Sequence, residues 1–360
     1  MFPRVYLIEL LLYTSMANVE RAWHSQILKE SFEVDRYMQA VLEHTAQAFQ
    51  AETHIGPYRL VKHLQQGGMA SVYLGYHIYA RTYVAIKVVD TYTADLKLLY
   101  REKEIMQALQ HEHIVPCLDA GQHGRYYYMV MPYLQGGTLE DMLIEKPLTL
   151  EETFIVLEQL TSALAYIHGL GILHRDIKPT NILFDQNYNL YLTDFGIASW
   201  LGDKPIHNGH VMGTPHYTAP ELFDGYVDQR SEVYSVGILL YQLLTGSLPF
   251  DGQSDWKICL HHRETQPLAP SFLNPSIPRA VERVILSALE KDPRRRYQTV
   301  EDLLYAFQNA LEAPTFFRHL STQWQATCQK LRDRLSPNTP PCQPAGIQAA
   351  LDMRSSEKYE

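Results

Sequence analysis

The run His174-Arg175-Asp176-Ile177-Lys178-Pro179-Thr180-Asn181 carries more information about this 360-residue chain than any other segment. Three short motifs follow it in order: Asp194-Phe195-Gly196, Gly213-Thr214-Pro215-His216-Tyr217 and Ala219-Pro220-Glu221. Any one of them could arise by chance, but the whole series in this order could not. We therefore interpret the four motifs as parts of one functional unit.

A turn of small residues lies upstream, in Leu64-Gln65-Gln66-Gly67-Gly68-Met69-Ala70-Ser71-Val72-Tyr73. Such a turn between two strands lets backbone N–H groups approach phosphate oxygens closely. Taken alone, the pattern is more typical of a plain hairpin, and it leaves both interpretations open.

The run Val84-Ala85-Ile86-Lys87 predicts a buried strand from which a cation emerges. A lone strand lysine is usually a solvated edge residue, but a carboxylate on the helix predicted at about 94–109 could pin it for phosphate binding. Glu102 and Glu104 compete for this role, because side chains two residues apart on a helix point about 200° apart. An apolar stripe puts Glu102 on the inward side; it consists of Leu98, Ile105 and Leu109.

The order of the predicted elements indicates an α+β fold. β-Branched and aromatic runs broken by glycine and charged turns predict strands over 58–131, with the one helix among them. Helical periodicity dominates from 138 onward, most clearly at Glu151–His168 and Ser231–Leu244. The second of these segments is apolar nearly all round, which predicts a buried helix. Strands followed by helices predict a β-rich lobe, a mostly helical lobe and a crevice between them.

The chain divides into three predicted units. Residues 1–56 form an N-terminal extension, predicted to be helical and without legible chemistry; Met16 is an alternative start. Residues 57–312 form the domain that carries the motifs. Residues 313–360 form a tail with a short helix and a Pro-rich linker.

Composition excludes several classes of protein. With 46% hydrophobic and 20% charged residues the chain is globular, and its net charge of −9 makes bulk nucleic-acid binding a poor hypothesis. No apolar run approaches the roughly 20 residues that a membrane span needs. The four cysteines contain no C-x-x-C pair, which predicts a reducing compartment without a disulfide framework or structural zinc; they are Cys117, Cys259, Cys328 and Cys342.

Taken together, the motifs resemble those of the eukaryotic-like protein kinase family, in particular its bacterial serine/threonine branch. The resemblance covers roughly residues 58–310. It implies a bilobal kinase fold, ATP and Mg²⁺ as cofactors, and transfer of the γ-phosphate to Ser or Thr hydroxyls of protein substrates. Lys178, two residues after Asp176, is similar to the serine/threonine rather than the tyrosine subclass.

The resemblance also implies a role for each matching residue. The expected catalytic and metal-binding roles are α/β-phosphate binding by Lys87, orientation of Lys87 by Glu102, proton acceptance by Asp176, γ-phosphate contact by Lys178, and Mg²⁺ binding by Asn181 and Asp194. Thr214 corresponds to the substrate-loop threonine. Glu221 and Arg296 correspond to a buried ion pair beneath the activation segment.

ATP is expected to bind between the lobes. The implied binding residues are Leu64, Gly67, Gly68, Val72, Ala85, Lys87, Met131, Pro132, Leu134 and Leu183. Met131 falls at the gatekeeper position. Pro132 lacks an N–H but keeps the carbonyl that the first hinge residue contributes, and Leu134 supplies the N–H.

Three residues depart from the family's pattern. Gln65 and Ala70 stand where the first and third glycines of the phosphate loop usually lie, and a left-handed backbone at Gln65 would cost about 1–2 kcal/mol. Glu232 replaces the aspartate that braces the backbone of the catalytic loop. We expect weakened ATP affinity from the first two changes and a shifted brace from the third.

The activation loop contains few phosphorylation sites. Between Gly196 and Gly213 the only hydroxyl residue is Ser199, although Arg175 is typical of kinases whose loop is ordered by a phosphate. This predicts a loop that orders without phosphorylation, with Asp203 as a fixed anion.

Three functions are compatible with the sequence. The first is an active serine/threonine kinase, the second a pseudokinase that binds nucleotide or partners, and the third a small-molecule phosphotransferase. The last is disfavoured, because Gly213–Glu221 matches a platform for peptide substrates. A cytoplasmic enzyme without a membrane span is the expectation, and the oligomeric state is not predicted.

Overall fold

The computed structural model of the protein describes residues 54–66, 70–201 and 213–311. The N-terminal extension up to residue 53, Gly67, Gly68, Asp203 and the predicted tail from residue 313 lie outside this part.

The N-terminal lobe is an antiparallel six-stranded sheet with strand order β1-β2-β3-β4-β6-β5. Its strands are β1 (His54–Ile55), β2 (Tyr58–Gln66), β3 (Ser71–His77), β4 (Thr82–Asp90), β5 (Asp119–His123) and β6 (Tyr126–Pro132). The sheet starts before the domain boundary predicted at residue 57, because buried Ile55 pairs with Tyr58. The one helix of this lobe, α2 (Leu96–Ala108), starts where the Asp95 carboxylate accepts a hydrogen bond from the Lys97 N–H.

The C-terminal lobe is mostly helical. Its helices are α3 (Leu139–Glu145), α4 (Leu150–Gly169), α5 (Gln229–Thr245), α6 (Asp255–Glu264), α7 (Pro270–Leu273), α8 (Arg279–Ala288) and α9 (Val300–Ala310). Capping boxes begin three of them; at α4 the Thr149 hydroxyl accepts from the Glu152 N–H and the Glu152 carboxylate accepts from the Thr149 N–H. The predicted helices at 151–168 and 231–244 thus match α4 and α5.

Helix α5 lies at the centre of the C-terminal lobe, as its apolar sequence predicts. It packs against α4, α7, α8 and α9, and most of its side chains are buried. It ends at Gly246, which has the left-handed conformation (φ 74°) that glycine adopts without a Cβ penalty. Gly237 allows α8 to approach, because a Cβ at this position would lie 2.9 Å from the Ala288 Cβ.

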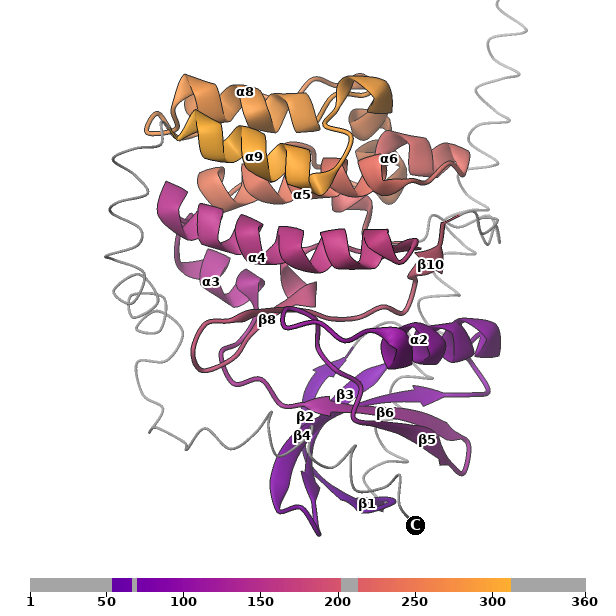
Figure 1. Cartoon of the computed structure of the whole chain (residues 1–360). Coiled ribbons are helices and arrows are strands. Elements are labelled where there is room, and N and C mark those ends of the chain that lie inside the picture. Colours follow the sequence, from indigo (N-terminus) through magenta and orange to yellow (C-terminus); the bar gives the residue numbers. More distant parts are fainter. Residues whose placement is uncertain (1–53, 67–69, 202–212, 312–360) are drawn as a thin grey trace, which may run out of the picture.

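Short strands and irregular segments lie between the sheet and the helices (Figure 1). Two-stranded ribbons pair β8 (Ile182–Phe184) with β9 (Leu190–Leu192), and β7 (Ile172–Leu173) with β10 (Ser199–Trp200). A β-rich lobe, a helical lobe and these connections form a bilobal α+β fold, which confirms the predicted architecture. None of the helices in the described ranges combines the length and apolarity that a bilayer crossing requires.

The contact between α5 and α8 predicts the effect of a larger side chain. Gly237→Val should lower the free energy of unfolding by about 1–3 kcal/mol, because the valine methyls have to displace Ala288 and Leu289. Chemical denaturation measures the loss. Gly169→Ala is the control, since a Cβ there meets no atom within 4 Å, and an equal loss in both variants would contradict the packing argument.

Candidate active site

A lysine and two carboxylates meet where β4 faces α2. Lys87 Nζ lies 2.6 Å from Glu102 Oε1 and 2.8 Å from Asp194 Oδ1. Glu102 is 4% exposed, whereas Glu104 on the same helix is exposed. The structure therefore places Glu102, and not Glu104, against Lys87.

Lys87 and Asp194 stabilise each other in their ionised forms, and the charge of Glu102 adds to the effect on Lys87. Burial disfavours the Lys87 ammonium, but the charges of Glu102 and Asp194 outweigh burial and raise the pKa of Lys87 above its usual value. The charge of Lys87 in turn lowers the pKa of Asp194 to about 2, and the partial desolvation of this half-exposed carboxylate, which acts in the opposite direction, does not offset it. At neutral pH the site holds a fixed cation beside a fixed anion.

Asp194 has a strained backbone held by its neighbours. Its φ of 65° is uncommon for a residue with a Cβ. The next residue, Phe195, is 1% exposed and its ring lies edge-to-face on His174, with centroids 4.7 Å apart. His174 is fully buried, and its Nε2 contacts the Thr193 carbonyl oxygen at 2.9 Å. Packing around Phe195 and His174 therefore fixes the direction of the Asp194 carboxylate.

A second cluster surrounds Asp176. One carboxylate oxygen accepts hydrogen bonds from the Thr214 N–H (3.2 Å) and hydroxyl (2.9 Å). The other lies 2.7 Å from Lys178 Nζ and 3.0 Å from Asn181 Nδ2. Lys178 also donates to the Thr214 hydroxyl (2.7 Å), and Asn181 Nδ2 donates to the Asp176 carbonyl (2.8 Å). The structure thus joins the first and third sequence motifs, with the carboxylate of Asp176 at their centre.

The backbone beside Asp176 is held from helix α5. Arg175 has φ 69°, and its N–H donates to Glu232 Oε1 at 2.7 Å. The other oxygen of Glu232 lies 2.5 Å from His168 Nε2 at the end of α4. The longer glutamate therefore contacts the catalytic-loop backbone from the position where the family usually has an aspartate.

The expected adenine-binding side chains lie together. Met131, Leu134 and Leu183 belong to one apolar cluster that also contains Val115 and Tyr191. The sheet register places the remaining two nearby: Ala85 pairs with Met131, and Val72 pairs with Lys87. Pro132 ends β6, opposite Val84.

The described part of the expected phosphate loop is the end of β2 and, from Ala70 onward, the residues that lead into β3. Leu64 is 36% exposed and lies at an irregularity of the β2–β3 register. Gln65 pairs with Val72 in the sheet, and its φ is not positive. The backbone cost considered for glutamine at this position does not arise in this conformation.

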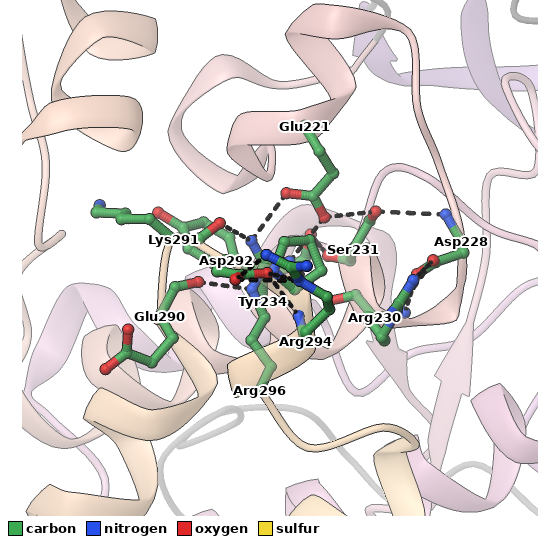
Figure 2. Close-up of polar contacts among 12 residues, drawn as sticks. Glu221, Asp228, Arg230, Ser231, Tyr234, Glu290, Lys291, Asp292, Arg294 and Arg296 are labelled. Carbon is green, nitrogen blue, oxygen red and sulfur yellow. Dashed lines mark hydrogen bonds and ion pairs between the residues drawn. The ribbon is translucent and has the colours of Figure 1, made fainter.

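Glu221 and Arg296 form a bidentate ion pair in the C-terminal lobe (Figure 2). Arg296 Nη1 and Nη2 lie 2.7 and 2.8 Å from the two Glu221 oxygens, and the Arg296 side chain is fully buried. Its remaining donors reach the carbonyl oxygens of Arg230, Glu290 and Lys291, and Ser231 donates to Glu221. A buried guanidinium with all these partners fixes the segment after Ala219 to the loop before α9.

The serine of the activation loop lies inside the fold. Ser199 is 2% exposed and pairs with Leu173 through the β10–β7 ribbon. Its hydroxyl is therefore not available to a modifying enzyme in this conformation. The predicted anion Asp203 lies outside the described residues.

Comparison with known proteins identifies the family of the chain. Residues 58–310 match the protein kinase domain family. The chain belongs to the protein kinase family. Similar proteins include the serine/threonine-protein kinase PrkC of Bacillus subtilis (40% identity, covering 72% of this chain and 41% of PrkC) and Pkn1 of Myxococcus xanthus (38%, covering 71% and 38%). A probable serine/threonine-protein kinase PknB of Lactococcus lactis is 36% identical. The matches thus span only about two-fifths of the length of these relatives.

The roles of two residues in the kinase domain cannot be predicted from the sequence pattern. His168 contacts Glu232, but nothing in the sequence distinguishes it as a buried histidine among the sixteen in the chain. Ser231 donates to Glu221 of the Glu221–Arg296 pair, and its place directly before Glu232 is the signal that could indicate this.

The Glu221–Arg296 pair of the kinase domain predicts a large effect on stability. Arg296→Met should reduce the free energy of unfolding by about 3–5 kcal/mol, because it leaves the mostly buried Glu221 carboxylate without its cation. Thermal and chemical denaturation measure the loss. Arg294→Met is the matched control, since the side chain of Arg294 is 82% exposed, and its unfolding midpoint should not change. Equal midpoints for the two variants would contradict the argument.

Proposed function

We propose that this chain is an active Mg-ATP-dependent protein serine/threonine kinase that transfers the γ-phosphate of ATP to Ser or Thr hydroxyls of protein substrates. The observation that carries the proposal is the pair of clusters around Lys87 and Asp176. In the first, Lys87 lies against Glu102 and Asp194, and in the second, Lys178 and Asn181 lie against Asp176. Phosphoryl transfer depends mainly on positioning and charge neutralisation, which is what such clusters offer.

Asp176 is the proposed proton acceptor for the substrate hydroxyl. Thr214, Lys178 and Asn181 hold its two oxygens in a fixed direction, as general-base catalysis requires. The hydroxyl of Thr214 lies on the segment that would face a bound peptide, so a substrate Ser or Thr would approach beside it. The names of the relatives support this substrate class.

Asn181 and Asp194 have the chemistry of a magnesium site. Asn181 uses Nδ2 for both of its contacts with Asp176, which leaves its amide oxygen for a cation. Asp194 is ionised and its side chain is 45% exposed, with one oxygen on Lys87. Hard oxygen donors of this kind suit Mg²⁺, which when bound would neutralise charge on the phosphates. Lys87, oriented by Glu102, would contact the α- and β-phosphates.

The proposed base predicts the effect of removing one charge. Asp176→Asn should reduce transfer of radiolabelled phosphate from ATP to a generic protein substrate by about 10²-fold or more, because the amide cannot accept the hydroxyl proton. Nucleotide affinity should change little. Asp302→Asn, at an exposed position on α9, is the control and should keep the wild-type rate.

The same assay decides between this function and the alternative of a pseudokinase. Wild-type protein that binds Mg-ATP without transferring phosphate would establish a scaffold or binding role instead. Full activity of Asp176→Asn would remove Asp176 from the reaction.

The buried Ser199 predicts how the activation loop behaves. We propose that the loop orders without phosphorylation at this residue, because Ser199 is buried and its backbone pairs with β7. Ser199→Ala should therefore keep the wild-type rate, and mass spectrometry of active protein should find Ser199 unmodified. A phosphorylated Ser199 together with an inactive alanine variant would refute this proposal.

A further inference from the structure

Helix α4 ends beside the catalytic loop with a histidine that none of the proposed chemistry uses. The His168 side chain is 6% exposed, and its Nε2 lies 2.5 Å from Glu232 Oε2. Glu232 on α5 is 2% exposed and gives its other oxygen to the Arg175 N–H at 2.7 Å. One buried carboxylate therefore connects an imidazole to the backbone that presents Asp176.

A buried carboxylate needs a countercharge, since an isolated anion in the interior is strongly disfavoured. Arg175 contributes a backbone N–H to Glu232, which is a dipole and not a full charge. Among the described side chains, the one in direct contact that can supply a full positive charge is His168. The contact is short enough for a charge-assisted hydrogen bond.

We propose that His168 is a positioning residue whose imidazolium holds Glu232, so that Glu232 can fix the left-handed turn at Arg175 and the direction of Asp176. The proposal rests on the kinase activity proposed above. Loss of the proton from His168 would weaken the hold of Glu232 on the Arg175 N–H and let Asp176 move away from the substrate hydroxyl. The rate of the chemical step would therefore depend on the protonation of a residue that never touches substrate.

The groups around His168 determine the direction of its titration. Burial lowers the pKa of His168, but the hydrogen bond and charge of Glu232 on α5, together with the charge of Glu301 on α9, raise it above the usual 6.5. Burial raises the pKa of Glu232, but His168, the charge of His174 and the Arg175 N–H lower it below the usual 4.5.

The sign of the pH dependence follows from these two shifts. The stabilisation from His168 is fully present below pH 6.5 and is lost as the pH rises through the raised pKa. The stabilisation from Glu232 is present above pH 4.5 and is lost as the pH falls through the lowered pKa. The ion pair therefore exists between the lowered pKa of Glu232 and the raised pKa of His168. Deprotonation of His168 sets its alkaline limit.

The test compares pH profiles of kcat at saturating Mg-ATP for wild type and His168→Gln. Glutamine still donates a hydrogen bond but does not titrate. We expect kcat of the variant to be about 10- to 100-fold lower at neutral pH, the size of effect that a small misplacement of a catalytic group produces. The fall in kcat that we expect for the wild type at alkaline pH should be absent from His168→Gln. The KM of the variant for ATP should stay near the wild-type value. His123→Gln, an exposed strand histidine, should reproduce the wild-type profile.

Two further measurements keep the proposal testable. If His168→Gln does not fold, Glu301→Gln removes the second carboxylate that favours the imidazolium, and the alkaline fall should move to lower pH. If the wild type transfers no phosphate, the proposed function fails, but the ion pair between His168 and Glu232 can still be tested through its effect on stability. The stability difference between wild type and His168→Gln should then shrink as the pH rises. An alkaline fall in His168→Gln equal to that of the wild type, or a stability difference independent of pH, would overturn the proposal.

Discussion

Two residues with side chains hold left-handed backbone conformations on either side of the candidate active site, and the rest of the site depends on keeping them there. Arg175 has φ 69° and Asp194 has φ 65°. Each such residue costs about 1–2 kcal/mol relative to an ordinary conformation. The two turns direct the carboxylates of Asp176 and Asp194, so the fold has to supply interactions that outweigh this cost.

Those interactions come from the buried parts of both lobes. The N–H of Arg175 is bound by Glu232 from the central helix α5, and the segment around Asp194 is fixed by the Phe195–His174 ring contact. His174 directly precedes Arg175, so the two strained turns share one packing unit. A shift of α4 or α5 would therefore change the positions of Asp176 and Asp194, although neither helix contains a reacting group.

The sequence predicted the architecture well because its periodicities and motifs are local. The strands over 58–131 and the helices at 151–168 and 231–244 follow from spacing alone, and they agree with β2–β6, α4 and α5. The choice of Glu102 over Glu104 also followed from a helical stripe. The partners of Glu232 could not be predicted in the same way. His168 and Glu232 meet only because α4 and α5 pack together, and the sequence alone does not indicate which faces of two helices come into contact.

The departures from the family's pattern have a common physical feature. Gln65 and Glu232 both occur where a backbone is supported, and neither changes the atoms that would react. Gln65 keeps a paired strand conformation with Val72, so the absence of glycine costs little there. The extra methylene of Glu232 is accommodated because its two oxygens find separate partners, a histidine and an amide. Because the Glu232 carboxylate is buried, losing the cation that neutralises it would be costly, so the brace depends on His168. The substitution is therefore compatible with activity to the extent that His168 keeps its proton.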